Sequence, residues 1–231
     1  MKIYENVIIG NFLYALGLNI GLHQNSTNKL SAINLLQQTP ADKSLGDVLL
    51  EYPGVVRLIE FKNKKSDKKK EKVRLKELSY ALSGDNHMQN ISKEIHWYIE
   101  TDPLDKICIN RIVPYLDAFN MDVYGIDTLE TYIDNMVNEI MLPSNNIEPS
   151  DLKAYLKIVS LCQGSGSIGT GGLLINITSS GVRYVQYTKL SHLLLQHKDF
   201  IKEVEKDYNS IMQHEQQEPK KERTKTYARG L

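Results

Sequence analysis

Cysteine is scarce in this chain: Cys108 and Cys162 are the only two among 231 residues, and they lie far apart in the sequence. Two such residues cannot form the disulfide framework of a small secreted scaffold or the paired spacing of a zinc site. Hydrophobic residues make up 41% of the sequence, which is ample for a core. The sequence therefore predicts a chain that folds on its hydrophobic core in a reducing environment.

Long hydrophobic runs are also missing, since no apolar segment approaches the roughly 20 residues that a membrane-spanning helix needs. Near the N-terminus, Lys2 is followed by Tyr4 and Glu5, and no small-residue cleavage site follows. This pattern is not that of a signal peptide. We therefore expect a cytoplasmic protein with no membrane partner.

The sequence has no excess charge of either sign, because 28 lysines and arginines balance 28 acids. This balance argues against a protein that coats nucleic acid through its overall charge. The charges are unevenly distributed, however. Residues 62–76 hold nine basic residues against two acids, and residues 100–151 hold eleven acids against two basic residues. A basic segment of this kind can still contact a phosphate backbone.

The most informative stretch is residues 45–62, which predicts a β-hairpin. Two runs rich in β-forming residues flank a Pro-Gly turn signal at 53–54. With the loop centred between these two residues, Asp47 lies directly opposite Glu60 on one face. A loop of three residues would shift the register by one and separate the two acids. The other face is apolar and carries Val48, Leu50, Ile59 and Phe61.

Carboxylates that face each other on a sheet repel, so the Asp47–Glu60 pair requires a compensating positive charge. Lys62, two residues after Glu60, can supply part of it. A divalent cation can supply more, because hard cations bind carboxylate oxygens. The alternative is an exposed hairpin face with an ordinary surface ion pair.

Asp47 followed by Glu60-Phe61-Lys62 resembles the PD-(D/E)xK nuclease superfamily, which has an acid on one strand and acid-x-Lys on the next. Gly46 stands where the family often has proline. The resemblance covers residues 1–100 most plainly. It implies an α/β (α+β) fold: a restriction-endonuclease-like core whose central mixed sheet is flanked by helices. Asp47, Glu60 and Lys62 would be the catalytic residues.

The resemblance also implies a site for Mg²⁺ or Mn²⁺. Its ligands would be Asp47, Glu60 and the Phe61 carbonyl. Lys62 would orient or help to deprotonate the attacking water and would offset developing negative charge. Family members often add a glutamate from the first helix, and Glu5 is the only acid in a helix predicted over 4–18. The alternative role of Glu5 is a favourable interaction with the helix dipole.

A lysine-rich segment follows the hairpin and leads into a helix predicted over about 71–83. Beside a phosphodiester site it would hold a nucleic-acid backbone, and the alternative is a solvated loop. The family often places a Lys, Gln or Tyr of this helix near the site, for which Lys76 and Tyr80 are the candidates. The predicted nucleic-acid-binding residues are Lys64, Lys65, Lys68, Lys69, Lys70, Lys72 and Lys76.

The chain is expected to have five parts. They are a nuclease-like core (1–102), an acidic helical insertion (103–162), a Gly-rich loop and hairpin completing the sheet (163–188), a long C-terminal helix (189–215) and a basic flexible tail (216–231). A strand over 95–100 belongs to the core, and its His96 is interpreted as a hydrogen-bonding residue at the strand surface. The Gly-rich loop contains GxGxxG, but it lies between a helix and a strand, in the reverse of the dinucleotide-binding order.

The C-terminal helix repeats residues at alternating spacings of four and three from Leu190 to Ile211, like a coiled-coil seam, and all are apolar or aromatic except His197. This seam either packs on the protein's own sheet or binds a second copy or a partner protein. The predicted function is a metal-dependent nuclease that acts on DNA in preference to RNA, and the resemblance suggests restriction or phage defence as its setting. The alternative is a non-catalytic interaction subunit that retains a nuclease-like fold.

Overall fold

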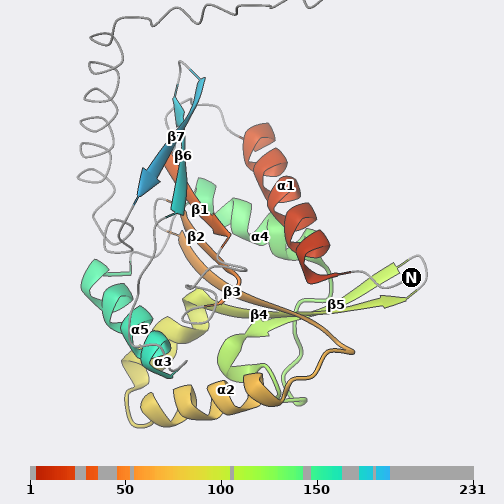
Figure 1. Cartoon of the computed structure of the whole chain (residues 1–231), viewed down its shortest axis with the longest axis vertical. Coiled ribbons are helices and arrows are strands. Elements are labelled where there is room, and N and C mark those ends of the chain that lie inside the picture. The colour runs from red at the N-terminus through yellow and green to blue at the C-terminus, as the bar shows by residue number, and fades with distance from the viewer. Residues whose placement is uncertain are drawn as a thin grey trace, which may run out of the picture.

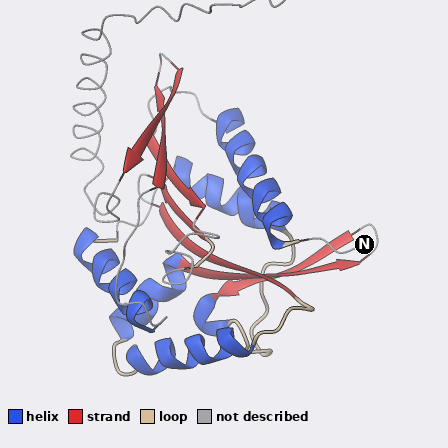
Figure 2. Cartoon of the chain, viewed as in Figure 1, coloured by secondary structure: helices blue, strands red, loops and turns tan. Residues whose placement is uncertain are grey.

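The computed structural model describes most of the first 162 residues and a later hairpin. The described ranges are 4–23, 30–35, 46–52, 55–104, 107–142, 147–162, 172–178 and 181–187. These residues form an α+β fold in which helices flank a mixed sheet (Figures 1 and 2). None of the described helices is both long enough and apolar enough to cross a membrane.

The described strands form one sheet in the order β5-β4-β3-β2-β1-β6-β7. They are β1 (Leu30–Leu35), β2 (Val48–Tyr52), β3 (Val55–Asn63), β4 (His96–Leu104), β5 (Ile107–Pro114), β6 (Gly172–Thr178) and β7 (Gly181–Tyr187). Neighbouring strands run antiparallel except β3 and β4, which are parallel. A parallel pair needs a crossover, and α2 (Lys69–Ala81) and α3 (Asn86–Ile95) provide it.

The hairpin predicted over 45–62 is confirmed together with its register. Val48 pairs with Ile59 and Tyr52 pairs with Val55, so the pairing aligns Asp47 with Glu60. The Asp47 amide also donates a hydrogen bond to the Ile59 carbonyl (3.1 Å). The predicted apolar face is buried throughout at Val48, Leu50, Ile59 and Phe61.

Two hydrophobic cores lie on opposite faces of the sheet, because side chains alternate along each strand. Helices α1 (Glu5–His23) and α4 (Leu129–Met141) cover the face of Phe61. The ring of Phe12 from α1 lies 5.5 Å from that of Phe61 and 6.1 Å from that of Tyr132 from α4. Helices α2, α3 and α5 (Pro149–Cys162) cover the other face, above Leu58. Asp47 and Glu60 share this second face.

Helix α3 was not predicted from the sequence. It begins after Asp85, whose carboxylate accepts a hydrogen bond from the Met88 amide (3.0 Å). This N-cap satisfies a backbone donor at the helix start, and it explains why a helix begins directly after the Gly84 turn. Residues 30–35, which precede the hairpin, form strand β1 and pair with β2 and β6.

The prediction of a helical insertion over 103–162 is wrong. Its first part is strand β5, which pairs antiparallel with β4 over its full length. The two helices that follow cover opposite faces of the sheet, so they complete both hydrophobic cores. The N-cap of α4 is Thr128, whose Oγ1 accepts a hydrogen bond from the Thr131 amide.

The hairpin predicted after the Gly-rich loop is confirmed. Strands β6 and β7 pair antiparallel and extend the sheet beside β1 (Figure 1). The Gly-rich loop at 163–171, the C-terminal helix predicted over 189–215 and the tail over 216–231 lie outside the described residues.

Candidate active site

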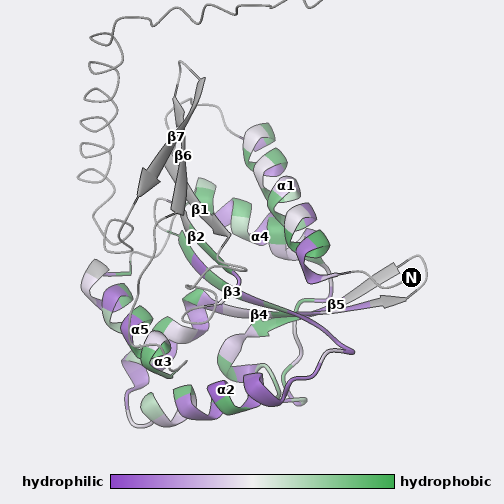
Figure 3. Ribbon diagram, viewed as in Figure 1, coloured by the Kyte–Doolittle hydropathy of each residue, from purple (hydrophilic) through white to green (hydrophobic). Residues whose placement is uncertain are grey.

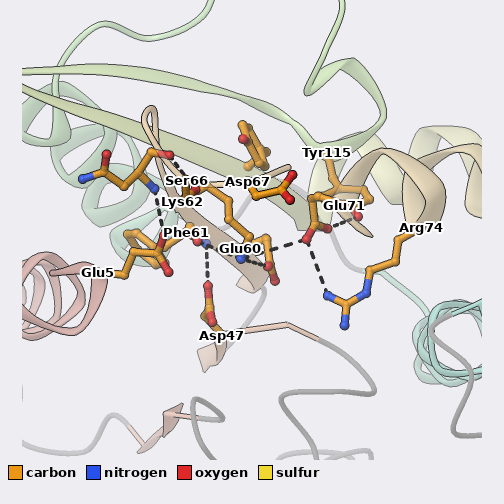
Figure 4. Close-up of polar contacts among 12 residues, drawn as sticks. Glu5, Asp47, Glu60, Phe61, Lys62, Ser66, Asp67, Glu71, Arg74 and Tyr115 are labelled. Atoms are coloured by element: carbon orange, nitrogen blue, oxygen red, sulfur yellow. Dashed lines mark hydrogen bonds and ion pairs between the residues drawn. The ribbon is translucent and has the colours of Figure 1, made fainter. Parts of the chain in front are cut away.

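Asp47 and Glu60 are both buried, with exposed fractions of 4% and 3%. Asp47 Oδ2 accepts a hydrogen bond from the Phe61 amide (2.7 Å), which fixes the carboxylate against β3 (Figure 4). Both acids are therefore buried side chains of the sheet. The alternative of an exposed hairpin face with a surface ion pair is wrong.

The electrostatics of Glu60 show the repulsion that the sequence predicted. Burial raises the pKa of Glu60 well above its usual value, and the negative charges of Asp47 and Glu71 raise it further. Lys62 opposes this shift, because its ammonium forms an ion pair with Glu60 Oε1. Lys62 thus supplies part of the compensating charge, because the pKa of Glu60 stays raised in its presence.

Lys62 Nζ lies among oxygen atoms of three residues. It donates to Glu60 Oε1 and to the Phe61 carbonyl (3.2 Å), and it lies 3.9 Å from Glu71 Oε2. Burial alone would lower the pKa of Lys62, but the charges of its acidic neighbours reverse this effect and hold the pKa above its usual value. Lys62 therefore remains an ammonium at neutral pH. The ammonium form of Lys62 can stabilise a negative charge, whereas it cannot abstract a proton from water.

Glu71, in the first turn of α2, is the acid of this cluster that the sequence analysis missed. It is 2% exposed, and its carboxylate accepts a hydrogen bond from the Tyr115 hydroxyl and pairs with Arg74 Nη1 (3.5 Å). A glutamate within a lysine run is usually a solvated residue. Its spacing from Leu75, Leu78 and Leu82 is helical, however, and would have placed Glu71 on the inward face.

Glu5 contacts the end of β3. Its Oε1 accepts a hydrogen bond from the Asn63 amide (2.9 Å), and this contact joins the start of α1 to the sheet. Figure 4 shows Glu5 on the far side of Lys62 from Glu71. The metal-binding role suggested for Glu5 stays a prediction.

The lysine-rich segment divides into paired and exposed side chains. Lys64 Nζ pairs with Asp102 (2.8 Å) and Lys68 pairs with Glu100, both on β4. Lys72 Nζ lies 5.4 Å from the ring centre of Phe119. Lys64 and Lys72 are nevertheless exposed, as are Lys65, Lys69, Lys70 and Lys76. Figure 3 shows this stretch, from the end of β3 into α2, as strongly hydrophilic.

The two α2 candidates for the site, Lys76 and Tyr80, are exposed, with Tyr80 83% accessible. Glu71 and Arg74 are the α2 residues that meet the acidic cluster instead. The reason is the helical phase: α2 buries Leu78, and residues two positions from it face solvent.

His96 is buried, and its predicted position at the strand surface is wrong. Its Nδ1 lies 2.8 Å from the Tyr155 hydroxyl, and its ring stacks on Tyr115 with 4.0 Å between ring centres. Burial lowers the pKa of His96 to about 3, so the imidazole is neutral near pH 7. Tyr115 thus lies between this neutral histidine and the Glu71 carboxylate.

Gly46, at the position where the PD-(D/E)xK nucleases often have proline, is required by the local backbone. Its φ is +149°, a conformation that side chains with a Cβ rarely adopt, and an added Cβ would lie 3.3 Å from Glu60 Oε2. Proline fixes φ near −65° and cannot take this conformation. A glycine at this position therefore lets the backbone lie close to Glu60.

The donor set suits a hard divalent cation in its chemistry. Asp47, Glu60 and the Phe61 carbonyl offer oxygen atoms, which Mg²⁺ and Mn²⁺ prefer. The cluster also has an excess of negative charge, since three acids (Asp47, Glu60 and Glu71) accompany two cations (Lys62 and Arg74). Within the described ranges no three acidic, histidine or cysteine side chains are gathered as metal ligands.

Comparisons of the chain with protein-family models, curated proteins and solved structures give no match. The resemblance to the PD-(D/E)xK nucleases therefore rests on the hairpin residues and their geometry.

Proposed function

We propose that the protein is a metal-dependent nuclease with a restriction-endonuclease-like core. The observation that carries this proposal is the buried pair of Asp47 and Glu60, aligned across the β2–β3 hairpin with Lys62 beside it. Burying two like charges costs free energy. Strongly shifted pKa values such as that of Glu60 are concentrated at functional sites.

In this proposal Asp47, Glu60 and the Phe61 carbonyl would hold Mg²⁺ or Mn²⁺. The bound ion would polarise the phosphate and lower the pKa of a water molecule. The Lys62 ammonium would stabilise the negative charge that develops on the phosphate, because its own acidic neighbours keep it protonated. The exposed lysines of the 64–76 segment would contact the nucleic-acid backbone, with DNA as the preferred substrate.

The test is divalent-dependent cleavage of plasmid, linear duplex and single-stranded DNA, with RNA in parallel. We expect cleavage with Mg²⁺ or Mn²⁺, none with a chelator, and a loss of about 100-fold or more in Asp47→Asn and Glu60→Gln. Asp134→Asn and Glu77→Gln, at exposed acids outside the cluster, are the matched controls. Wild-type rates in both site variants would show that the assignment is wrong.

Loss of activity must be separated from loss of the fold. The raised pKa of Glu60 means that its charged form is less favourable in the folded protein than in the unfolded chain. This unfavourable contribution is absent at low pH and grows as pH rises through the folded pKa. Glu60→Gln should therefore be at least as stable as the wild type at pH 8 without metal, as measured by urea unfolding.

A second candidate is a non-catalytic interaction subunit, and one observation favours it. Lys62 already pairs with Glu60 and the Phe61 carbonyl, so a large part of the negative charge is balanced within the protein. A subunit of this kind would show no stabilisation by Mg²⁺ or Mn²⁺. The nuclease requires a thermal shift with either ion that disappears in Asp47→Asn.

A further inference from the structure

Glu71 is a second carboxylate within reach of Lys62, besides Glu60. Its Oε2 lies 3.9 Å from Lys62 Nζ, which is longer than a hydrogen bond and short enough for an ion pair. Glu60 and the Phe61 carbonyl hold the closer contacts to the same ammonium. Lys62 therefore has two close partners, Glu60 and the Phe61 carbonyl, and a third partner, Glu71, at a longer distance.

The oxygen atoms that Lys62 contacts are also those that the proposed function assigns to the cation. An ammonium and a divalent cation repel each other, so both cannot stay on Glu60 Oε1 and the Phe61 carbonyl. Glu71 is then the carboxylate left beside Lys62. A shift of about 1 Å along the flexible lysine side chain would close the 3.9 Å gap to a hydrogen bond.

Glu71 is already fixed for this role. Tyr115 donates a hydrogen bond to its Oε1, and Arg74 pairs with its Oε2 at 3.5 Å. Both of its oxygens are thus held, the side chain is 2% exposed, and it projects from a helix rather than from a loop (Figure 4). Because the carboxylate is already dehydrated and oriented, little reorganisation is needed when it receives Lys62.

We propose that Glu71 is a positioning residue that receives the Lys62 ammonium when Glu60 and the Phe61 carbonyl bind a divalent cation. The inference rests on the proposed function and adds to it. Glu71 keeps Lys62 inside the site, close to the position of the phosphate, and prevents it from competing with the cation for Glu60.

The test is a double-mutant cycle on cation affinity, measured by calorimetric titration with Mn²⁺ in the absence of nucleic acid. The four proteins are the wild type, Glu71→Gln, Lys62→Met and the double variant. We expect Glu71→Gln to weaken Mn²⁺ binding about tenfold in the presence of Lys62 and by less than about twofold in the Lys62→Met background. Lys62→Met alone should bind Mn²⁺ more tightly than the wild type, because a competing cation is gone.

Each other result overturns the inference in a distinct way. An equal loss in both backgrounds would mean that Glu71 acts on the cation itself. No loss in either background would make Glu71 a purely structural residue. A wild type that binds no Mn²⁺ would refute the proposed function and this inference together, whereas Mn²⁺ binding without coupling would refute this inference alone.

The choice of variants controls for a loss of the fold. The glutamine amide oxygen can still accept the Tyr115 hydrogen bond, and Glu77→Gln makes the same change at an exposed position of α2. Should Glu71→Gln fail to fold, Tyr115→Phe replaces it in the cycle, because it frees Glu71 without removing its charge. It should weaken Mn²⁺ binding about twofold to fivefold in the presence of Lys62, and not in Lys62→Met.

Discussion

Tyr115 connects two buried polar groups, Glu71 and His96, on the face of the sheet that α2, α3 and α5 cover. Its hydroxyl donates to Glu71 and its ring stacks on His96, which itself contacts Tyr155. Burial raises the pKa of the Tyr115 hydroxyl, so it stays protonated and available as a donor. The orientation of Glu71 thus depends on how a neutral histidine packs beneath the site.

His96 gives a prediction on acid stability. The unfolded chain binds a proton at His96 below pH 6.5, whereas burial holds the folded pKa at about 3. Stability should therefore fall as pH drops below 6.5, with a contribution from this residue approaching about 1.4 kcal/mol per pH unit. Urea unfolding between pH 7.5 and 4.5 should show a shallower slope in His96→Gln.

The matched control is His87→Gln, at an exposed histidine of α3. A slope in His96→Gln that equals the wild-type slope would mean that the buried imidazole takes up its proton without unfolding.

Single residues were the hardest part to predict from the sequence. Asp47, Glu60 and Lys62 were placed correctly, because hairpin pairing depends on a turn and on alternation, which are both local. Glu71 and His96 were misjudged, because each is buried with a partner that is distant in sequence. Glu71 contacts Tyr115, 44 positions away, and His96 contacts Tyr155, 59 positions away. A lysine run and a strand surface were the reasonable local interpretations.

At the scale of elements, the lysine-rich segment joins β3 to α2 and has two parts with different chemistry. Lys64 and Lys68 are held by the β4 carboxylates Asp102 and Glu100, and these pairs reduce their availability to a phosphate. Lys65, Lys69 and Lys70 are exposed. We choose these three, which lie at the start of the segment, to test the proposed contact with a nucleic-acid backbone.

Changing Lys65, Lys69 and Lys70 together to serine should weaken DNA binding and flatten its salt dependence. Fewer counterions are released, so the slope of log K against log salt should fall by about 2 to 3. Fluorescence anisotropy with a short duplex at several salt concentrations, in a buffer that prevents cleavage, measures both quantities.

The control triple is Lys93, Lys153 and Lys157 to serine, which removes the same charge from exposed positions of α3 and α5. If the two triples change the salt slope equally, the segment is a solvated loop that contributes only through net charge.

Strand β5 shows why an element can escape sequence analysis. Pro103 lies in β4 and Pro114 ends β5, and proline within a pattern normally argues against a strand. The surrounding acids also favoured an exposed helical region. Pairing with β4 outweighs both signals, because it buries Ile112 and Val113 on the two faces of the sheet.

At the scale of the whole molecule, the sheet separates the site from the core of α1 and α4. Side chains alternate between the two faces, so Glu60 and Lys62 belong to one and Ile59 and Phe61 to the other. The mixed sheet with flanking helices was expected from the resemblance to the PD-(D/E)xK nucleases, and the described residues form such a sheet. The contribution of α4 and α5 to both cores was not, because the acidic composition of this region indicated a separate insertion.

The C-terminal seam from Leu190 to Ile211 gives a prediction about assembly. We expect it to pack on the protein's own sheet, so Ile201→Asp should bury a charge and lower stability by about 2 kcal/mol or more. Light scattering should find a wild-type monomer at micromolar concentration. Gln196→Asp introduces the same charge at a position off the seam and serves as the control.

A wild-type dimer that becomes a folded monomer in Ile201→Asp would show instead that the seam binds a second copy. That arrangement would bring two Asp47–Glu60 sites together, as cleavage of both strands of a duplex commonly requires.

The parallel pairing of β3 with β4 also has a consequence for the order of folding. The Asp47–Phe61 hydrogen bond spans only 14 residues, and hairpins form within about 1–10 μs. The Tyr115–Glu71 contact spans 44 residues and must wait for the α2–α3 crossover. The two like charges are therefore brought together early, with Lys62 as their nearest counter-charge, and the groups that fix Glu71 arrive late.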